Sequence, residues 1–290
     1  MIYLKLFVMA FLWGGTFVAA RCVAQDVLPL SASFLRFLVA SLFLIVLVVK
    51  REGHIPRLQR RQILPVILLG LTGVMAYNIF FFLGLKTITA SRASLIVAMN
   101  PVFIALFSAF LFKERLGAGR VMGIILCLCG AFIVISHGNL SDIYAGRLGI
   151  GELYILGCVF SWVFYSLIGK SVIADLSPLV AVTYACVIGV GGLLLPACFE
   201  GLWATLPHYP AAAWAGILFL GFFGTFLGFT WYYEGIRSIG PSRAAVFINF
   251  VPVSGVFLGW LILDEAMDWS ILVGAVLVVG GAFLTNAGKE

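Results

Sequence analysis

Two asparagines lie close to prolines inside long apolar segments, and these residues are well placed to bind a polar molecule. Asn100 directly precedes Pro101, and Asn249 stands three residues before Pro252. An amide side chain both donates and accepts hydrogen bonds. A proline within a helix removes one backbone N–H and clashes with the carbonyl four residues earlier. We expect freed carbonyls and amides to face a substrate, with both prolines as hinges. The alternative is that the prolines only kink their helices.

Aromatic and polar side chains recur in other apolar segments. Trp13 and Trp162 lie in the middle of their segments, where anchoring at the membrane interface explains a tryptophan poorly. Aromatic walls suit ring-bearing substrates, or cations held over a ring face. The alternative role is helix packing. The remaining residues that we expect to line a cavity are Thr16, Tyr77, Asn78, Tyr165, Trp231 and Tyr232.

Two charged residues are candidates for gating or coupling. Arg36 lies inside an apolar segment, where an arginine costs about 2.5–3.5 kcal/mol on insertion scales, so it needs a partner or a watery path. Its alternative is to extend to the nearer interface. Glu234 precedes Arg237 by three residues, which is the spacing of an ion pair on one helix. Its alternative role is to couple transport to a proton or to bind a substrate amine.

The composition places all of these residues in a membrane. Of the 290 residues, 63% are hydrophobic and 10% are charged, and the mean hydropathy is +1.14. Soluble domains are about half apolar and about a quarter charged. The net charge of +6 comes from short loops between apolar runs, which is typical of membrane orientation and does not indicate nucleic-acid binding.

The sequence shows no pattern for metal, nucleotide or covalent chemistry. Cys127 and Cys129 lack the spacing of a zinc or redox pair, and the three histidines lie between the apolar runs. No glycine-rich loop with lysine and serine or threonine could bind ATP phosphates. We expect no metal, no cofactor and no enzymatic activity, with an intramembrane enzyme as a remote alternative.

The apolar runs predict an all-α integral membrane protein with ten membrane-spanning helices. A span needs about 20 apolar residues, and lipid cannot satisfy the polar groups of an irregular backbone. The predicted spans are 2–20, 30–49, 63–82, 88–112, 119–136, 150–169, 178–198, 212–235, 241–263 and 270–286.

The basic residues predict the orientation, because lysine and arginine concentrate in cytoplasmic loops. With the N-terminus inside, few basic residues face the other side: Arg21, Lys86, Arg92 and Arg147. The cytoplasmic side then holds Lys5, Lys50, Arg51, Arg57, Arg60, Arg61, Lys113, Arg115, Arg120, Lys170, Arg237, Arg243 and Lys289. We expect both termini in the cytoplasm of a cell with a bacterial-type inner membrane.

The chain repeats itself. Residues 90–102 recur as 241–253, with serine, arginine, alanine, proline and valine in matching places. At the same interval, Gly70, Gly84, Glu114, Gly123 and Gly130 recur as Gly221, Gly235, Glu265, Gly274 and Gly281. At an interval of 149, Trp13 recurs as Trp162 and Pro29 as Pro178. Five helices per copy is an odd number, so residues 1–137 and 148–290 should form two repeats of inverted topology around a central cavity.

Several motifs carry a resemblance to a known family. They are the early Phe11-Leu12-Trp13-Gly14-Gly15-Thr16-Phe17, the second-segment Ser33-Phe34-Leu35-Arg36-Phe37, and the acidic turns Phe112-Lys113-Glu114-Arg115-Leu116 and Leu263-Asp264-Glu265-Ala266-Met267. In this order they resemble the EamA family of the drug/metabolite transporter superfamily. The resemblance implies alternating access and the export of small metabolites such as amino acids or amines. Uptake or exchange by the same fold is the alternative.

The expected partners follow from this resemblance. They are a small-molecule substrate, the surrounding lipid and, where transport is coupled, a proton. The small-residue face of Gly224 and Gly228 suits close helix packing within one chain, so we expect a monomer or a weak dimer.

Overall fold

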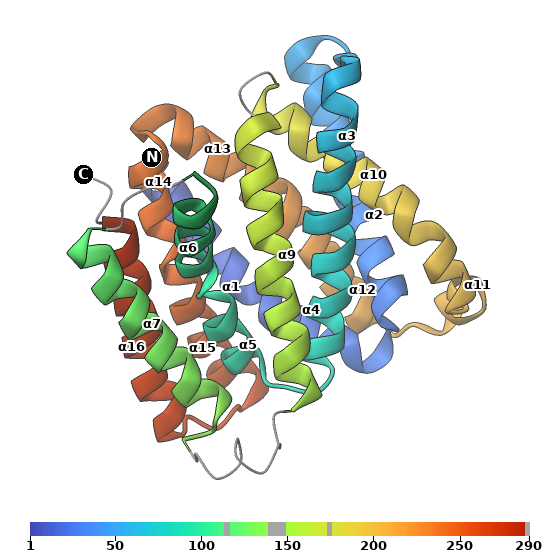
Figure 1. Cartoon of the computed structure of the whole chain (residues 1–290). Coiled ribbons are helices and arrows are strands. Elements are labelled where there is room, and N and C mark those ends of the chain that lie inside the picture. Colours follow the sequence, from blue (N-terminus) through green and yellow to red (C-terminus); the bar gives the residue numbers. More distant parts are fainter. Residues whose placement is uncertain (113–116, 139–148, 173–175, 288–290) are drawn as a thin grey trace.

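Helices run through every apolar segment of the chain, because lipid offers no partner for an unpaired backbone group. The computed structural model (Figure 1) describes residues 1–112, 117–138, 149–172 and 176–287. Within these ranges there is no strand, and nine helical segments are long and apolar enough to cross a membrane. A further apolar helix, Trp269–Thr285, is shorter and corresponds to the predicted span 270–286. The predicted class of an all-α membrane protein is confirmed.

Six of the apolar helices are uninterrupted. They are α1 (Ile2–Asp26), α2 (Pro29–Glu52), α7 (Ala118–Ile135), α9 (Ile150–Val172), α10 (Pro178–Phe199) and α16 (Trp269–Ala287). Helices α2 and α10 both begin at a proline, whose fixed φ suits the first turn and whose missing N–H has no partner there. Short helices α11 (Leu202–Thr205) and η2 (Leu206–His208) follow α10.

Two membrane segments contain a π-helical stretch that the sequence analysis did not predict. The first runs through α3 (Arg60–Leu69), η1 (Gly70–Ala76) and α4 (Tyr77–Leu85), and the second through α12 (Ala211–Leu218), η3 (Phe219–Leu227) and α13 (Gly228–Ile239). A π-helical turn shifts the backbone bonding and is frequent at functional sites. The residue that begins η1, Gly70, recurs as Gly221 within η3, so the two stretches occupy corresponding places.

The two proline-containing segments are broken, which corrects the expectation of continuous helices with kinks. They divide into α5 (Ala90–Val97) and α6 (Asn100–Phe112), and into α14 (Pro241–Ile248) and α15 (Phe250–Leu263). At each break the backbone forms a tighter turn, in which an N–H donates to the carbonyl three residues earlier. Met99 N–H donates to the Ile96 carbonyl, and Asn249 N–H donates to the Val246 carbonyl. Pro101 and Pro252 then lie in the first turn of the second helix, where no intrahelical N–H is needed.

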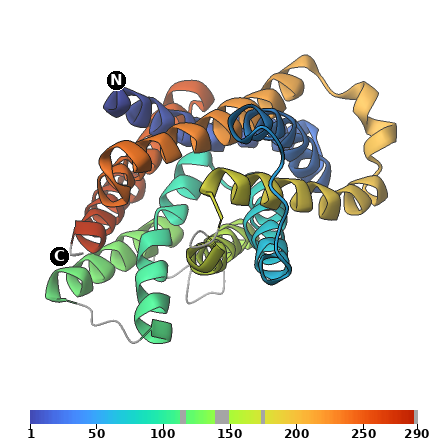
Figure 2. The same cartoon turned by 90° about the horizontal axis from the view of Figure 1, so that it is seen from above.

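The two halves of the sequence are interleaved in space. Helix α1 packs on α12, η3, α13, α14 and α15 of the second half, and α9 packs on α3, η1, α4, α5 and α6 of the first. Figure 2 shows the blue N-terminal helix lying among the orange and red helices. Each half therefore donates its first helix to the other.

Contacts between the halves also come in corresponding pairs. A Cβ on Gly70 would meet the carbonyl of Ala185 and the side chain of Ile188, and a Cβ on Gly221 would meet the carbonyl of Arg36 and the side chain of Val39. Helices α7 and α16 pack through glycines, with Gly123 facing Gly281 and Gly130 facing Gly274. Since the residue numbers of these contacts rise along α7 and fall along α16, the two helices are antiparallel.

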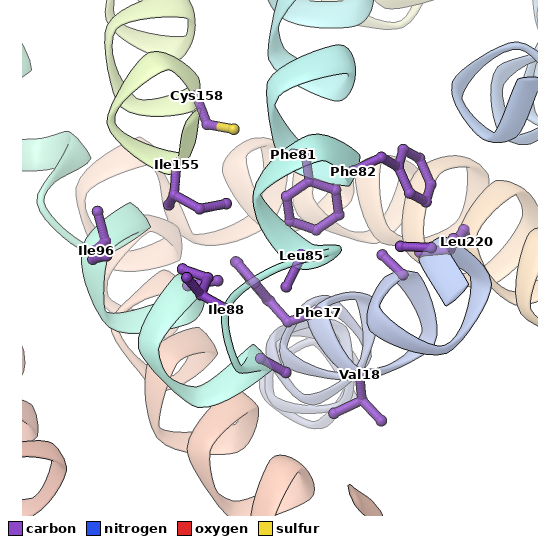
Figure 3. Packing of buried hydrophobic residues seen from close by; sticks show 14 of the residues in the cluster. Phe17, Val18, Phe81, Phe82, Leu85, Ile88, Ile96, Ile155, Cys158 and Leu220 are labelled. Carbon is purple, nitrogen blue, oxygen red and sulfur yellow. The ribbon is translucent and has the colours of Figure 1, made fainter. Parts of the chain in front are cut away.

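The main core lies where both halves meet. Phe17 of α1, Phe81 and Phe82 of α4, Ile155 of α9 and Leu220 of η3 are almost completely buried, and Figure 3 shows them together. Phe17 and Phe81 meet edge to face, with ring centroids 5.2 Å apart. Burying each such ring contributes about 1.5–3 kcal/mol in water, but in lipid the same contacts act mainly through close packing.

Candidate substrate site

Arg36 lies at the centre of the candidate site and joins the two π-helical stretches. Its Nη1 donates to Asn78 Oδ1 at 2.9 Å, and its Nε reaches Thr225 Oγ1 at 3.4 Å. Asn78 in turn donates to the Val74 carbonyl of η1, while Thr225 belongs to η3 and donates to the Leu220 carbonyl. Arg36 is only 8% exposed, so the alternative that it extends to the membrane interface is wrong.

Three of the predicted aromatic residues form a wall beside this arginine. The ring of Tyr77 lies 5.6 Å from that of Trp162, which lies 5.1 Å from that of Tyr165. Tyr165 fills the space that Gly73 leaves open, since a Cβ there would lie 2.1 Å from its ring. The two tyrosine hydroxyls and the Trp162 indole N–H make no hydrogen bond within the described residues. We name these three residues the aromatic wall.

A second predicted group gathers on the other side of η3. The indole N–H of Trp13 donates to the Gly224 carbonyl at 2.8 Å, and the Thr16 hydroxyl donates to the Trp13 carbonyl. The Trp13 ring lies 5.6 Å from that of Tyr232. A Cβ on Gly224 would lie 2.6 Å from Thr16 Cγ2. Trp13 therefore links this group: its indole binds the Gly224 carbonyl of η3, its own carbonyl binds Thr16, and its ring packs near Tyr232.

The two asparagines lie at the helix breaks, as their sequence positions require. Asn100 begins α6, and its side-chain Oδ1 is fully buried with no hydrogen bond from the described residues. Asn249 directly follows α14 and is 8% exposed. A buried amide oxygen without a donor costs about 1–3 kcal/mol. Asn100 therefore holds an unpaired, buried acceptor beside the helix break.

Two predicted residues lie outside these hydrogen-bonded contacts. Trp231 packs against Leu6, Met9 and Ala244, a small cluster that Trp13 and Tyr232 also border. Glu234 is paired with Lys5 at 2.8 Å and with Arg51 at 3.0 Å. The ion pair with Arg237 that the helical spacing predicted is wrong, because the Glu234 side chain turns toward Lys5 of α1 and Arg51 of α2.

Acidic residues that the sequence analysis did not assign to the site tie helices together. Glu265 accepts hydrogen bonds from the N–H groups of Ala90 and Ser91 and from the Ser91 hydroxyl, all at the start of α5. Glu200 binds the start of α2 in the same way through Leu30 and Ser31. A carboxylate is favourable at a helix N-terminus, so each acid stabilises a distant helix start. The recurrence of Glu265 was the only sequence signal for this role.

Arg92 lies in the first turn of α5 and ties this helix to its neighbours. Its Nη2 contacts Asp268 Oδ2 at 2.6 Å, and its Nη1 donates to the Val134 carbonyl. Partial burial would raise the pKa of Asp268, but hydrogen bonds from Ser270 and Ile271 and the charge of Arg92 outweigh it and lower that pKa. The ion pair is therefore fully formed at neutral pH.

Two surface pockets lie away from the predicted residues. One of about 150 Å³ is an apolar groove between α1 and α15 that includes Phe11 and Phe250. The other, of about 320 Å³, lies near Thr87, Arg92 and Glu152. The described residues contain no group of three His, Cys, Asp or Glu side chains that could hold a metal. Neither pocket includes a residue predicted for the substrate site.

Comparison with known proteins identifies the family. A model of the EamA-like transporter family matches residues 1–136 and again 149–287. The chain belongs to the EamA-like transporter family. As an EamA protein it is a multi-pass membrane transporter, which confirms the family resemblance read from the sequence motifs.

Relatives of this EamA protein carry transporter names. It is 29% identical to the uncharacterized transporter YyaM of Bacillus subtilis, over 99% of this chain and 93% of that one. It is 27% identical to a protein of Chlamydia trachomatis named S-adenosylmethionine/S-adenosylhomocysteine transporter, over 96% of this chain and 87% of that one. A solved crystal structure with 22% identity covers 98% of this chain and 97% of its own, with a TM-score of 0.66, which supports the fold alone. These names point to a non-enzymatic role.

Proposed function

We propose that this EamA protein is a secondary active carrier that exports small metabolites by alternating access. Its two halves, 1–137 and 148–290, form five-helix repeats of inverted topology around a central site. The observation that carries the proposal is the paired contact of Gly70 with α10 and of Gly221 with α2. A two-fold axis in the membrane plane generates such reciprocal contacts, and transporters with inverted repeats bind substrate near this axis.

The broken helices support a mechanism in which one part of the bundle rocks against another. Each break replaces continuous helix bonding by a tight turn, next to Asn100 in one half and at Asn249 in the other. Hinges are a few element-terminal residues that absorb changes in φ and ψ. Pro101 and Pro252 would keep the two helix halves distinct, while the asparagines beside them contact the substrate.

Polar contacts at the two ends of the bundle support a gating role for charged residues. At one end Arg92 and Asp268 join α5 to the start of α16. At the other end Glu234 holds Lys5 and Arg51, and so joins α13 to α1 and α2. In alternating access these ties would break in turn. Glu234 is therefore our candidate for gating or proton coupling, together with Arg36 in the centre.

The proposed cargo is a small metabolite such as an amino acid or an amine. The cargo named for the chlamydial relatives is itself a small metabolite, which agrees with this class. We propose a location in the cell membrane with both termini in the cytoplasm. The basic residues concentrate near the ends of α2, α3 and α13, and lysine and arginine favour cytoplasmic loops.

The test is transport by the purified full chain in liposomes. A panel of labelled amino acids, amines and nucleosides is assayed by counterflow, with and without an imposed pH gradient. We expect saturable movement of at least one solute, and a dependence on the gradient if a proton is coupled. If a pH gradient drives the solute in the direction that corresponds to entry into the cell, the result would support the uptake alternative. A folded protein that moves no solute under any gradient would refute the carrier.

A further inference from the structure

Among the described residues, Arg36 is a buried positive charge without a negatively charged partner. Arg36 is buried, and its two hydrogen-bond partners, Asn78 and Thr225, are neutral. The described ion pairs involve other cations. Two rings lie near the guanidinium, those of Phe37 at 5.2 Å and Phe81 at 5.8 Å. Aromatic faces compensate a buried charge only in part, so the site favours a further, negatively charged group.

The charge does not follow from the repeated architecture. The corresponding positions of the other half hold neither an arginine nor its polar partners. The counterparts are Ala185 for Arg36, Phe229 for Asn78 and Val74 for Thr225. The equivalent helix contact, Gly70 against the backbone of Ala185, forms without any charge. Alanine is thus sufficient for this helix contact in the other half. The packing of the helices alone does not explain the arginine at position 36.

Arg36 keeps a hydrogen-bond donor available for a ligand. Its Nε and Nη1 are hydrogen-bonded, but its Nη2 makes no hydrogen bond within the described residues. Nη2 is also not completely enclosed by the protein. A guanidinium edge matches the two oxygens of a carboxylate. Phe81, next to the guanidinium, stacks on Tyr77 at 5.8 Å. The aromatic wall therefore continues directly from the cation.

We propose that Arg36 binds a single carboxylate of the transported substrate while the aromatic wall packs the rest of the molecule. This rests on the proposed function. One guanidinium balances one negative charge, whereas a phosphate monoester carries about 1.5 to 2. The fixed positive charge repels a simple amine. The substrate class is therefore small monocarboxylates, amino acids included, with an apolar or aromatic body.

The first test compares compounds that differ only at the carboxyl group. Inhibition of counterflow is measured with L-phenylalanine, L-phenylalaninamide and phenethylamine, and with the matching valine and methionine series. A charged hydrogen bond implies that the amides and amines inhibit about ten-fold more weakly or worse. In Arg36→Met this ratio should fall to near one. Equal inhibition in the wild type, or a transported solute without a carboxylate, would overturn the proposal.

A second variant separates ligand binding from folding. Asn78→Asp places a carboxylate 2.9 Å from Nη1 with almost no change of shape, and so supplies the missing counter-ion from within the protein. We expect the new ion pair to offset the lost hydrogen bond to the Val74 carbonyl, so that thermal stability is kept. Carboxylate inhibition should weaken by about ten-fold. Gln25→Glu makes the same chemical change at an exposed position and should change neither. If carboxylates inhibit counterflow by Asn78→Asp as strongly as by the wild type, Arg36 has a structural role only.

The experiments separate failure of the proposed role of Arg36 from failure of the proposed transport function. If solutes move but carboxylates and amides compete equally, the transporter stands and the role of Arg36 falls. If no solute moves, the proposed function falls, and the same carboxylate and amide pairs are then compared by thermal shift of the purified protein. Stabilisation by the carboxylates alone, lost in Asn78→Asp, would still support the binding site. Absence of any difference would overturn it.

Discussion

Glu265 illustrates how one side chain can hold two distant parts of this transporter together. Its carboxylate accepts two backbone N–H groups and one hydroxyl at the start of α5. This acid lies just past the end of α15, where a negative charge opposes the helix dipole and needs a partner. The structure supplies that partner from α5, 175 residues away along the chain.

We predict that Glu265→Ala lowers the stability of the protein. Loss of the carboxylate leaves the first N–H groups of α5 without an acceptor, which costs about 1–3 kcal/mol. Thermal unfolding of the purified protein measures the change. Asp264→Asn is the control, because Asp264 has φ of 51° and asparagine tolerates that conformation. Equal unfolding temperatures for Glu265→Ala and the control would contradict the capping role.

The π-helical stretches are the elements that most clearly distinguish this fold from a set of straight helices. Glycines at corresponding places let a neighbour approach each stretch closely, Tyr165 at Gly73 and Thr16 at Gly224. Both neighbours are predicted site residues, so backbone shape and side-chain position are coupled here.

Gly73→Ala should therefore impair the protein more than an ordinary glycine replacement. The new methyl group would overlap the Tyr165 ring, and overpacking of this kind costs about 1–3 kcal/mol. Gly191→Ala in α10 is the matched control, since a Cβ there meets nothing within 4 Å and alanine favours a helix by up to about 1 kcal/mol. Stability and counterflow should fall only in Gly73→Ala. Comparable behaviour of both variants would show that the close contact is unimportant.

The helix breaks lead to a prediction about turnover. Pro101→Ala and Pro252→Ala restore a backbone N–H in the first turn after each break and allow the two helix halves to join. We expect expression to change little and the free energy of unfolding to change by less than about 1 kcal/mol. The transport rate should fall several-fold. Initial rates in liposomes, normalised to folded protein, give the comparison. Parallel loss of expression and rate would assign the prolines a structural role alone.

Much of this architecture could be predicted from the sequence, because lipid permits few backbone forms. The apolar runs located the helices, and the repeated proline stretch located both breaks, although as kinks. The tertiary contacts could not be read in this way. Glu234 had a partner at helical spacing in Arg237, yet it binds Lys5 and Arg51. The partner of a charged side chain depends on which helices meet, and one-dimensional spacing does not contain that information.

At the scale of the molecule, the two halves share one plan but differ in charge. Helix α1 begins and α16 ends at the same end of the bundle (Figure 1), together with the connection between α2 and α3. Arg92 is buried and paired with Asp268, whereas its counterpart Arg243 is exposed. In the proposed alternating-access carrier, such differences would let the two ends of the bundle open under different conditions.

Inverted topology makes a prediction that a parallel arrangement does not. His54 follows α2 and His208 follows α10, the second long helix of each half, and both are exposed. In a parent with its six cysteines replaced, His54→Cys and His208→Cys are treated with a membrane-impermeant maleimide. On intact cells only the cysteine at position 208 should react, and in inside-out vesicles only that at position 54, because basic loops stay in the cytoplasm. Labelling of both positions from one side would mean that the halves run in the same direction, and the central two-fold site would have to be abandoned.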